Sequence, residues 1–168
     1  GLHAQYFSLN EHYSIEPRFG IRWKLNENQT LGFAYGLHSQ LESIGIYLSE
    51  QNIPGGKILP NMNLDFAKAH HFVLGYDRQL SDNLIFKIEA YYQELYDIPV
   101  VPGSYKALIN LDNIAVFNDS LVNTGSGYNT GIELTFEKYL SQGYYYLFTA
   151  SLFSSKYRGG DGMIRSSR

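Results

Sequence analysis

Long stretches of this chain alternate between apolar and polar residues, one position at a time. In the clearest stretch, 14–25, the odd positions from Ile15 to Leu25 are all apolar, and the even positions include Glu16, Arg18, Arg22 and Lys24. A period of two indicates a strand with one face in an apolar medium and the other in water. At about 3.3 Å per residue and a tilt near 45°, a dozen residues span roughly 28 Å, close to the hydrocarbon thickness of a bilayer. Strands of soluble proteins most often have only about five or six residues.

The same alternation recurs along the chain and predicts seven strands. They are expected at 2–8, 14–25, 30–40, 70–80, 84–96, 128–139 and 144–157. No segment has a convincing 3.6-residue period, so we expect no helices to cover the apolar faces. The predicted fold is all-β: an antiparallel meander of about seven long strands that forms part of a transmembrane β-barrel.

The connectors between these strands are of two kinds. Three are short and polar, at 26–29, 81–83 and 141–143, and are predicted to be tight turns. The other two, 41–69 and 97–127, are expected to be irregular; they have about thirty residues each and are rich in Gly, Pro and Asn, and loops of that length are usually functional. The tight turns fall on one side of the meander and the long loops on the other, as in outer-membrane barrels. The connector 9–13 is an exception, since it is short but falls on the long-loop side.

Aromatic residues are abundant, with 15 Tyr and 10 Phe, and their positions agree with this orientation. The tryptophan and several tyrosines on the apolar phase lie near the two ends of the strands. Trp23, Tyr76, Tyr144 and Tyr146 lie near the tight turns, and Tyr92 and Tyr128 lie near the opposite ends. Two aromatic girdles on either side of an aliphatic band are typical of membrane barrels.

Composition excludes several classes of function. The net charge is −3 and the sequence has no basic stripe, so nucleic-acid binding has no electrostatic support; the absence of cysteine excludes disulfide scaffolds and thiolate chemistry. The sequence contains no run of about 18 apolar residues, so no transmembrane helix is predicted. The mean hydropathy of −0.25 is compatible with a membrane barrel, because half of each strand faces water. The chain begins with Gly1 and shows no signal peptide, so we expect a fragment or a processed product.

Candidate catalytic and metal-binding residues are few. The chain has five histidines, His3, His12, His38, His70 and His71. Adjacent residues on a strand point to opposite faces, so His70 and His71 are not expected to share a metal ion, and a solvated histidine at a strand mouth is the preferred interpretation of this pair. Glu133 and Glu137 share a face but lie some 13 Å apart, too far for a glycosidase pair. No phosphate loop, nucleophile elbow or zinc-protease motif occurs. We therefore predict no enzyme activity, no catalytic or metal-binding residues and no cofactor, and we assign no ligand-contacting residue.

Several segments in collinear order resemble the barrel of TonB-dependent outer-membrane receptors, particularly the Bacteroidota type with a carboxypeptidase-regulatory-like N-terminal domain. The segments are 16–20 (EPRFG), 34–40 (AYGLHSQ), 89–96 (EAYYQELY), 131–138 (GIELTFEK) and 151–157 (SLFSSKY). This family has a barrel of twenty-two strands around an N-terminal plug, captures ligand at the outer face and imports it when the TonB complex pulls on the plug. The resemblance implies location in the cell outer membrane. It implies as partners the membrane lipid, the protein's own plug domain, the TonB complex through the missing N-terminal part, and an imported small-molecule or oligomeric ligand.

The chain departs from this family by omission. It shows no plug, no TonB-contacting segment and no final strand that ends in an aromatic residue, and seven strands are too few to close a membrane barrel. We therefore interpret residues 1–168 as a partial receptor barrel that contributes to ligand capture at the cell surface and import into the periplasm. Two alternatives remain open: a passive outer-membrane porin, which would share every barrel signature, and a soluble β-sandwich binding module, which would have shorter strands and no sorting of aromatics by height.

Overall fold

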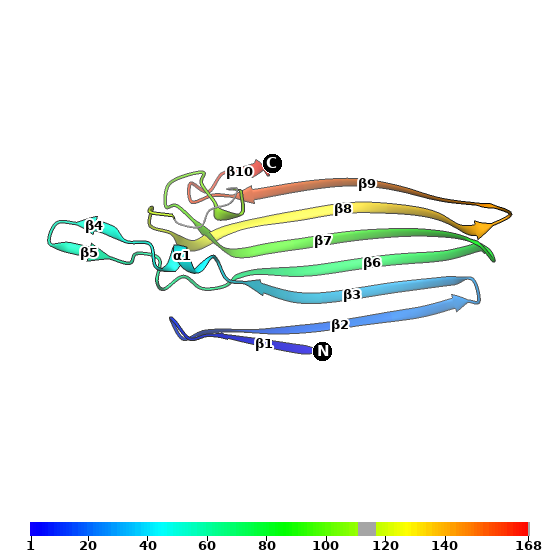
Figure 1. The fold of residues 1–168 in the computed structure, drawn as a ribbon, viewed down its shortest axis with the longest axis horizontal. Helices are drawn as coiled ribbons and strands as arrows, with labels where there is room; N and C mark the ends of the chain where they lie inside the picture. Colours follow the sequence, from blue (N-terminus) through cyan, green and yellow to red (C-terminus); the bar gives the residue numbers. More distant parts are fainter. Residues whose placement is uncertain (111–116, 168) are drawn as a thin grey trace.

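The chain folds into one long antiparallel sheet (Figure 1). The computed structural model describes residues 1–110 and 117–167. Strands make up 68% of it and helices 4%, which confirms the predicted all-β class. The sheet has eight strands in sequence order, each antiparallel to the next: β1 (Leu2–Phe7), β2 (His12–Asn26), β3 (Gln29–Gln40), β6 (Ala67–Ser81), β7 (Leu84–Val100), β8 (Val122–Ser141), β9 (Tyr144–Arg158) and β10 (Ile164–Ser166).

All seven predicted strands are present in the predicted order, but several extend further than predicted. The largest differences are at β7, which ends at Val100 instead of residue 96, and at β8, which begins at Val122 instead of residue 128. Their pairing continues past a register shift between Leu95 and Ile98, where Asp97 has a φ of 54°. Such a shift accommodates Pro99, which has no N–H to donate to the neighbouring strand. The proline is one reason why this stretch was predicted to be part of a loop. At Gly125 a Cβ would lie 2.4 Å from Val100 Cγ1, so only glycine permits the approach.

The long connectors lie together at one end of the sheet and the tight turns lie at the other (Figure 1). The expectation that 41–69 is irregular is wrong: it contains the helix α1 (Ile44–Tyr47) and the hairpin of β4 (Gln51–Ile53) and β5 (Gly56–Ile58). A helix of four residues is too short to leave a helical period in the sequence. The second connector contains the 3₁₀ turn η1 (Leu108–Asn110), and its residues 111–116 lie outside the described residues. No helix in the described ranges is long and apolar enough to cross a membrane.

The pairing register sorts the side chains of the sheet onto two faces. One row across six strands consists of apolar residues: Ile21, Phe33, Leu74, Ala90, Ile132 and Leu152. We call the face that carries this row the apolar face. Its side chains are strongly exposed, with 62% of Ile21 and 80% of Leu152 accessible, so nothing in the described residues covers them. Exposure on this scale is unusual for an apolar sheet face and indicates an apolar partner.

The opposite face, which we call the polar face, carries charged and small residues. The row next to the one above consists of Arg22, Gly32, Gly75, Glu89, Glu133 and Ser151. Arg22 pairs across the sheet with Asp77 at 2.8 Å, and a shallow hollow on this face is lined by these two residues together with Lys87 and Glu89. The alternation seen in the sequence therefore corresponds to two chemically distinct faces of one sheet.

Candidate functional site: a loop cap above the polar face

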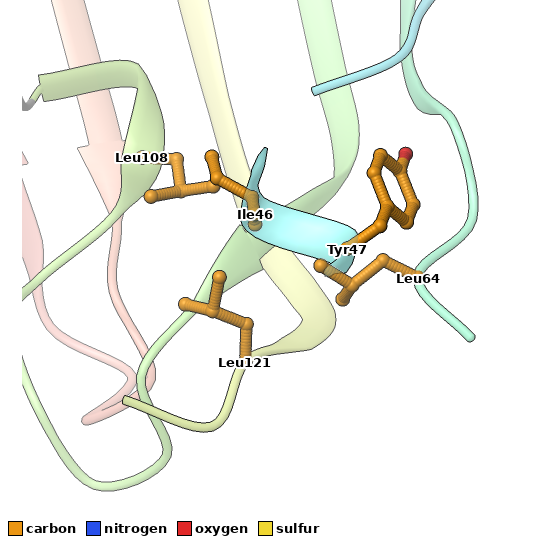
Figure 2. Close-up of a cluster of buried hydrophobic side chains, with 5 residues drawn as sticks. All are labelled: Ile46, Tyr47, Leu64, Leu108 and Leu121. Carbon is orange, nitrogen blue, oxygen red and sulfur yellow. The ribbon is translucent and has the colours of Figure 1, made fainter. Parts of the chain in front are cut away.

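The long connectors fold together into a single body at one end of the sheet. We call this body the loop cap and define it as the described parts of 41–66 and 101–121, with the turn 159–163. Its centre is a buried apolar cluster drawn from both connectors: Ile46, Tyr47, Leu64, Leu108 and Leu121 (Figure 2). Ile46 and Tyr47 come from α1, so this short helix is held by tertiary packing and not by its own length.

Asn61 joins the two connectors through its side chain, which is fully buried. Its Nδ2 group donates to the carbonyl oxygens of Phe117 at 3.3 Å and of Asp119 at 3.1 Å. Its Oδ1 accepts from the backbone N–H of Leu121 at 2.9 Å. One amide thus satisfies three backbone groups that belong to the other connector, as buried backbone groups require.

Asn123 makes a second bridge, between the first connector and the β7 bulge. Its Nδ2 donates to the carbonyl oxygens of Asp65 at 3.1 Å and of Asp97 at 2.7 Å, and its Oδ1 accepts from the N–H of Asp65 at 2.9 Å. Ser49 adds a third link, since its Oγ accepts from the N–H of Phe117 at 3.2 Å. These polar links fix the position of one loop against the other.

The turn 159–163 is packed against the second connector. A Cβ on Gly160 would lie 2.1 Å from the carbonyl oxygen of Val101, so the two backbones are in direct contact. The guanidinium of Arg165 donates two hydrogen bonds to the Asp161 carboxylate, at 2.9 Å and 2.6 Å. These bonds hold the pKa of the Asp161 carboxyl below its usual range. Within the cap interior, burial raises the pKa of the Glu42 carboxyl and of the Tyr47 phenol.

Glu16 lies on the polar face near the loop end of β2 and is only 1% exposed. Its Oε1 accepts from Gln5 Nε2 and from Ser39 Oγ, each at 2.6 Å, and its Oε2 accepts from Arg18 at 2.6 Å. The expectation that Glu16 faces water is therefore wrong. Side chains of β1 and β3 surround it, and a carboxylate can be buried when its oxygens are paired in this way.

The histidines are distributed as the strand geometry requires. His70 lies on the apolar face, where its Nδ1 is 3.0 Å from the hydroxyl of Tyr35, and His71 lies on the polar face beside His38, with ring centroids 4.5 Å apart. His70 and His71 are both partly exposed. Sequence reasoning missed the contact between His38 and His71 because it depends on the register of β3 against β6. Residues 1–110 and 117–167 contain no group of three or more His, Cys, Asp or Glu placed to hold a metal ion.

The carboxylates of the polar face have neighbours on other strands that their spacing along one strand does not reveal. Glu133 and Glu137 lie two rows apart on the same face of β8, as predicted, but the direct neighbour of Glu133 is Glu89 on β7. Two like charges directly opposite each other destabilise a dry sheet. The pair therefore indicates that this face is in contact with water or with a polar partner.

No protein-family model matches this chain, and no curated protein matches it. Three features of the described residues bear on function: the exposed apolar face, the charged polar face and the loop cap.

Proposed function

We propose that this chain is part of the barrel wall of an outer-membrane TonB-dependent receptor, which captures a ligand at the cell surface and imports it into the periplasm. One observation carries the membrane part of this proposal: the band of exposed apolar side chains shifts from strand to strand as it crosses the sheet. The receptor part is supported by the resemblance of the barrel segments and by the fixed architecture of the loop cap.

The shift is measured from the row that runs from Ile21 on β2 to Leu152 on β9. Toward the loops, β2 has four further apolar positions on this face (Phe19, Pro17, Ile15 and Tyr13), whereas the next position on β9 is Ser154. Toward the turns, β2 has two (Trp23 and Leu25) and β9 has four (Ala150, Phe148, Tyr146 and Tyr144). Between β2 and β9, the boundary of the band on the loop side thus moves by four positions and the boundary on the turn side by two, which gives a mean shift of three positions.

This shift corresponds to a strand tilt that barrels have. Three positions on one face are six residues, or about 20 Å along the strands, and the five steps from β2 to β9 cover about 24 Å. The band therefore crosses the strands with a slope equivalent to a tilt of roughly 40°, within the range of membrane barrels. A membrane presents a level apolar slab, so tilted strands must carry a band of this slant. A soluble sandwich has no such requirement.

The loop cap supports ligand capture. Its two connectors are joined by a buried cluster and by the bridge of Asn61, and Asn123 ties the first connector to the bulge of β7, so the connectors present one preorganised surface at the loop end of the sheet. Preorganisation lowers the entropic cost of binding a ligand. The charged polar face is suited to a polar plug domain, and transport through the plug and the TonB complex is what the family resemblance implies.

Depth labelling of the full-length receptor in lipid vesicles tests the slant. Single cysteines are placed at Phe19, at Phe148 and at Ser154 in a background without other cysteines, labelled with a fluorescent dye and quenched by brominated lipids. Phe19 and Phe148 lie midway along the apolar runs of their strands, so we expect both dyes to be deep. Ser154 shares a register row with Phe19 through Tyr35, Phe72, Tyr92 and Thr130, yet its dye should be shallow. Equal depth for Phe19 and Ser154 would contradict the proposed tilt.

Surface labelling tests the orientation. The β4–β5 hairpin projects from the loop cap (Figure 1), and its turn at Gly55 and Gly56 is exposed, so an epitope tag should be tolerated there. We expect this tag to react with antibody on intact cells. A tag in the turn 81–83 should react only after the outer membrane is permeabilised. A reversed pattern would remove the assignment of the long loops to ligand capture.

A further inference from the structure

A groove on the apolar face lies just beyond the end of the apolar band, where β7, β8, β9 and β10 meet. We propose that it binds the phosphate of a membrane lipid headgroup, with Lys156 and Arg158 as the phosphate ligands. The proposal rests on the membrane location proposed above. The groove is lined by Glu94, Ser126, Tyr128, Lys156, Arg158 and Ile164.

Lys156 and Arg158 are placed side by side by their strand. They are two residues apart on β9, hence on the same face and about 6.6 Å apart along the strand. Their register partners are Tyr128 and Ser126 on β8, and Ile164 on β10 lies on the other side of Arg158. Lys156 Nζ lies 6.0 Å from the centre of the Tyr128 ring, at the outer limit of a cation–π contact.

Neither cation is neutralised within the described part of the chain. No carboxylate there lies within 4.0 Å of Lys156 or of Arg158, whereas the nearby Arg165 is neutralised by two hydrogen bonds to Asp161. Two unpaired cations that converge on one groove form a site for an anion with several acceptor oxygens, and a phosphate supplies them.

The height of the groove selects a lipid phosphate over a soluble one. The apolar run of β9 ends at Leu152, and Lys156 lies four residues further on, about 13 Å along the strand and roughly 10 Å higher at a tilt of 40°. Tyr128 lies in the row of Lys156 and Tyr92 one row closer to the apolar band, and the two rings are stacked with centroids 6.4 Å apart, as expected for an aromatic belt. A lipid whose phosphate is held at Lys156 and Arg158 can lay its acyl chains along Leu152 and Ile132.

Glu94 sets the position of the anion within the groove. It is the register partner of Tyr128 on β7, so its carboxylate lies two strands from Lys156 and repels a phosphate from the β7 side. The phosphate is therefore held against β9. This arrangement makes a prediction of opposite sign for two residues of the same groove: removal of either cation weakens binding, and removal of the Glu94 charge strengthens it.

The test uses full-length receptor in lipid vesicles, with a dye on a cysteine at Ile164 and brominated phosphatidic acid diluted into phosphatidylcholine as the probe. We expect half-maximal quenching at a low fraction of phosphatidic acid. Each of Lys156→Gln and Arg158→Gln should raise that fraction about fivefold, the factor for about 1 kcal/mol per cation near an anionic surface. Glu94→Gln should lower it. Lys138→Gln is the matched control, a cation at the turn end of the same strand pair, and should leave it unchanged.

Three outcomes would overturn the site: an unchanged fraction in the Lys156/Arg158 double variant, an equal response to the Lys138 control, or displacement of the probe by millimolar inorganic phosphate. Failure of the membrane location has a different signature. In that case a dye at Leu152 would not be quenched by any brominated lipid, including phosphatidylcholine, and the lipid site would be overturned together with the membrane location.

Discussion

Replacement of Ile21 by arginine is expected to destabilise the folded protein by about 2–4 kcal/mol in lipid, because the proposed membrane location puts a cation at this position near the bilayer midplane on the lipid side of a barrel. Ile21 is 62% exposed and lies well inside the apolar run of β2, one position from its centre at Phe19. The physical reason is that the guanidinium loses its hydration and gains no partner, because its register neighbour is Phe33.

The matched control is the next residue along the strand. Arg22→Gln removes an exposed ion pair with Asp77 on the polar face, so it should cost no more than about 1 kcal/mol. Equilibrium unfolding of the full-length receptor from lipid vesicles measures both variants. Equal penalties at the two positions would refute the assignment of the apolar face to lipid.

The strands were predictable from the sequence because a period of two can be recognised within one strand, whichever strands lie beside it. The ends of strands were less predictable. β7 continues through the bulge at Asp97 and through Pro99 because Gly125 on β8 allows the close approach, and neither strand alone reveals that. The slant of the apolar band was also invisible, since alternation assigns a residue to a face but gives no register against the next strand.

The loop cap was beyond sequence reasoning for a different reason. Ile46, Leu64, Leu108 and Leu121 are apolar residues scattered through two loops with no common period, so nothing local predicts that they meet. Asn61 lies in a segment rich in Gly, Pro and Asn, where nothing in the sequence distinguishes it from an ordinary turn residue. Glu16 was misjudged because its pairing needs side chains from β1 and β3, whereas the alternation within β2 indicated only a polar position.

The cap also offers the sharpest test of the role of the loops. Asn61→Ala removes the partner of three backbone groups, among them the buried N–H of Leu121, and each buried group left without a partner costs about 1–3 kcal/mol. We expect the cap to open locally, with amide hydrogen exchange in 41–66 and 117–121 accelerated by at least about tenfold. Amides in the centres of β7 and β8 should exchange as before, because their ladders do not depend on Asn61.

Asn52→Ala is the control for this experiment, since Asn52 lies in β4 of the same connector but is exposed and makes no side-chain hydrogen bond within the described residues. Its exchange should match that of the unmodified receptor. Unchanged exchange in the Asn61 variant would mean that the apolar cluster and the other polar links hold the connectors without Asn61. If the cap opens while capture of the receptor's ligand on intact cells is unaffected, the ligand is recognised elsewhere on the receptor. If the cap opens and capture falls with it, the preorganised surface made by these two loops is the part of the wall that receives the ligand.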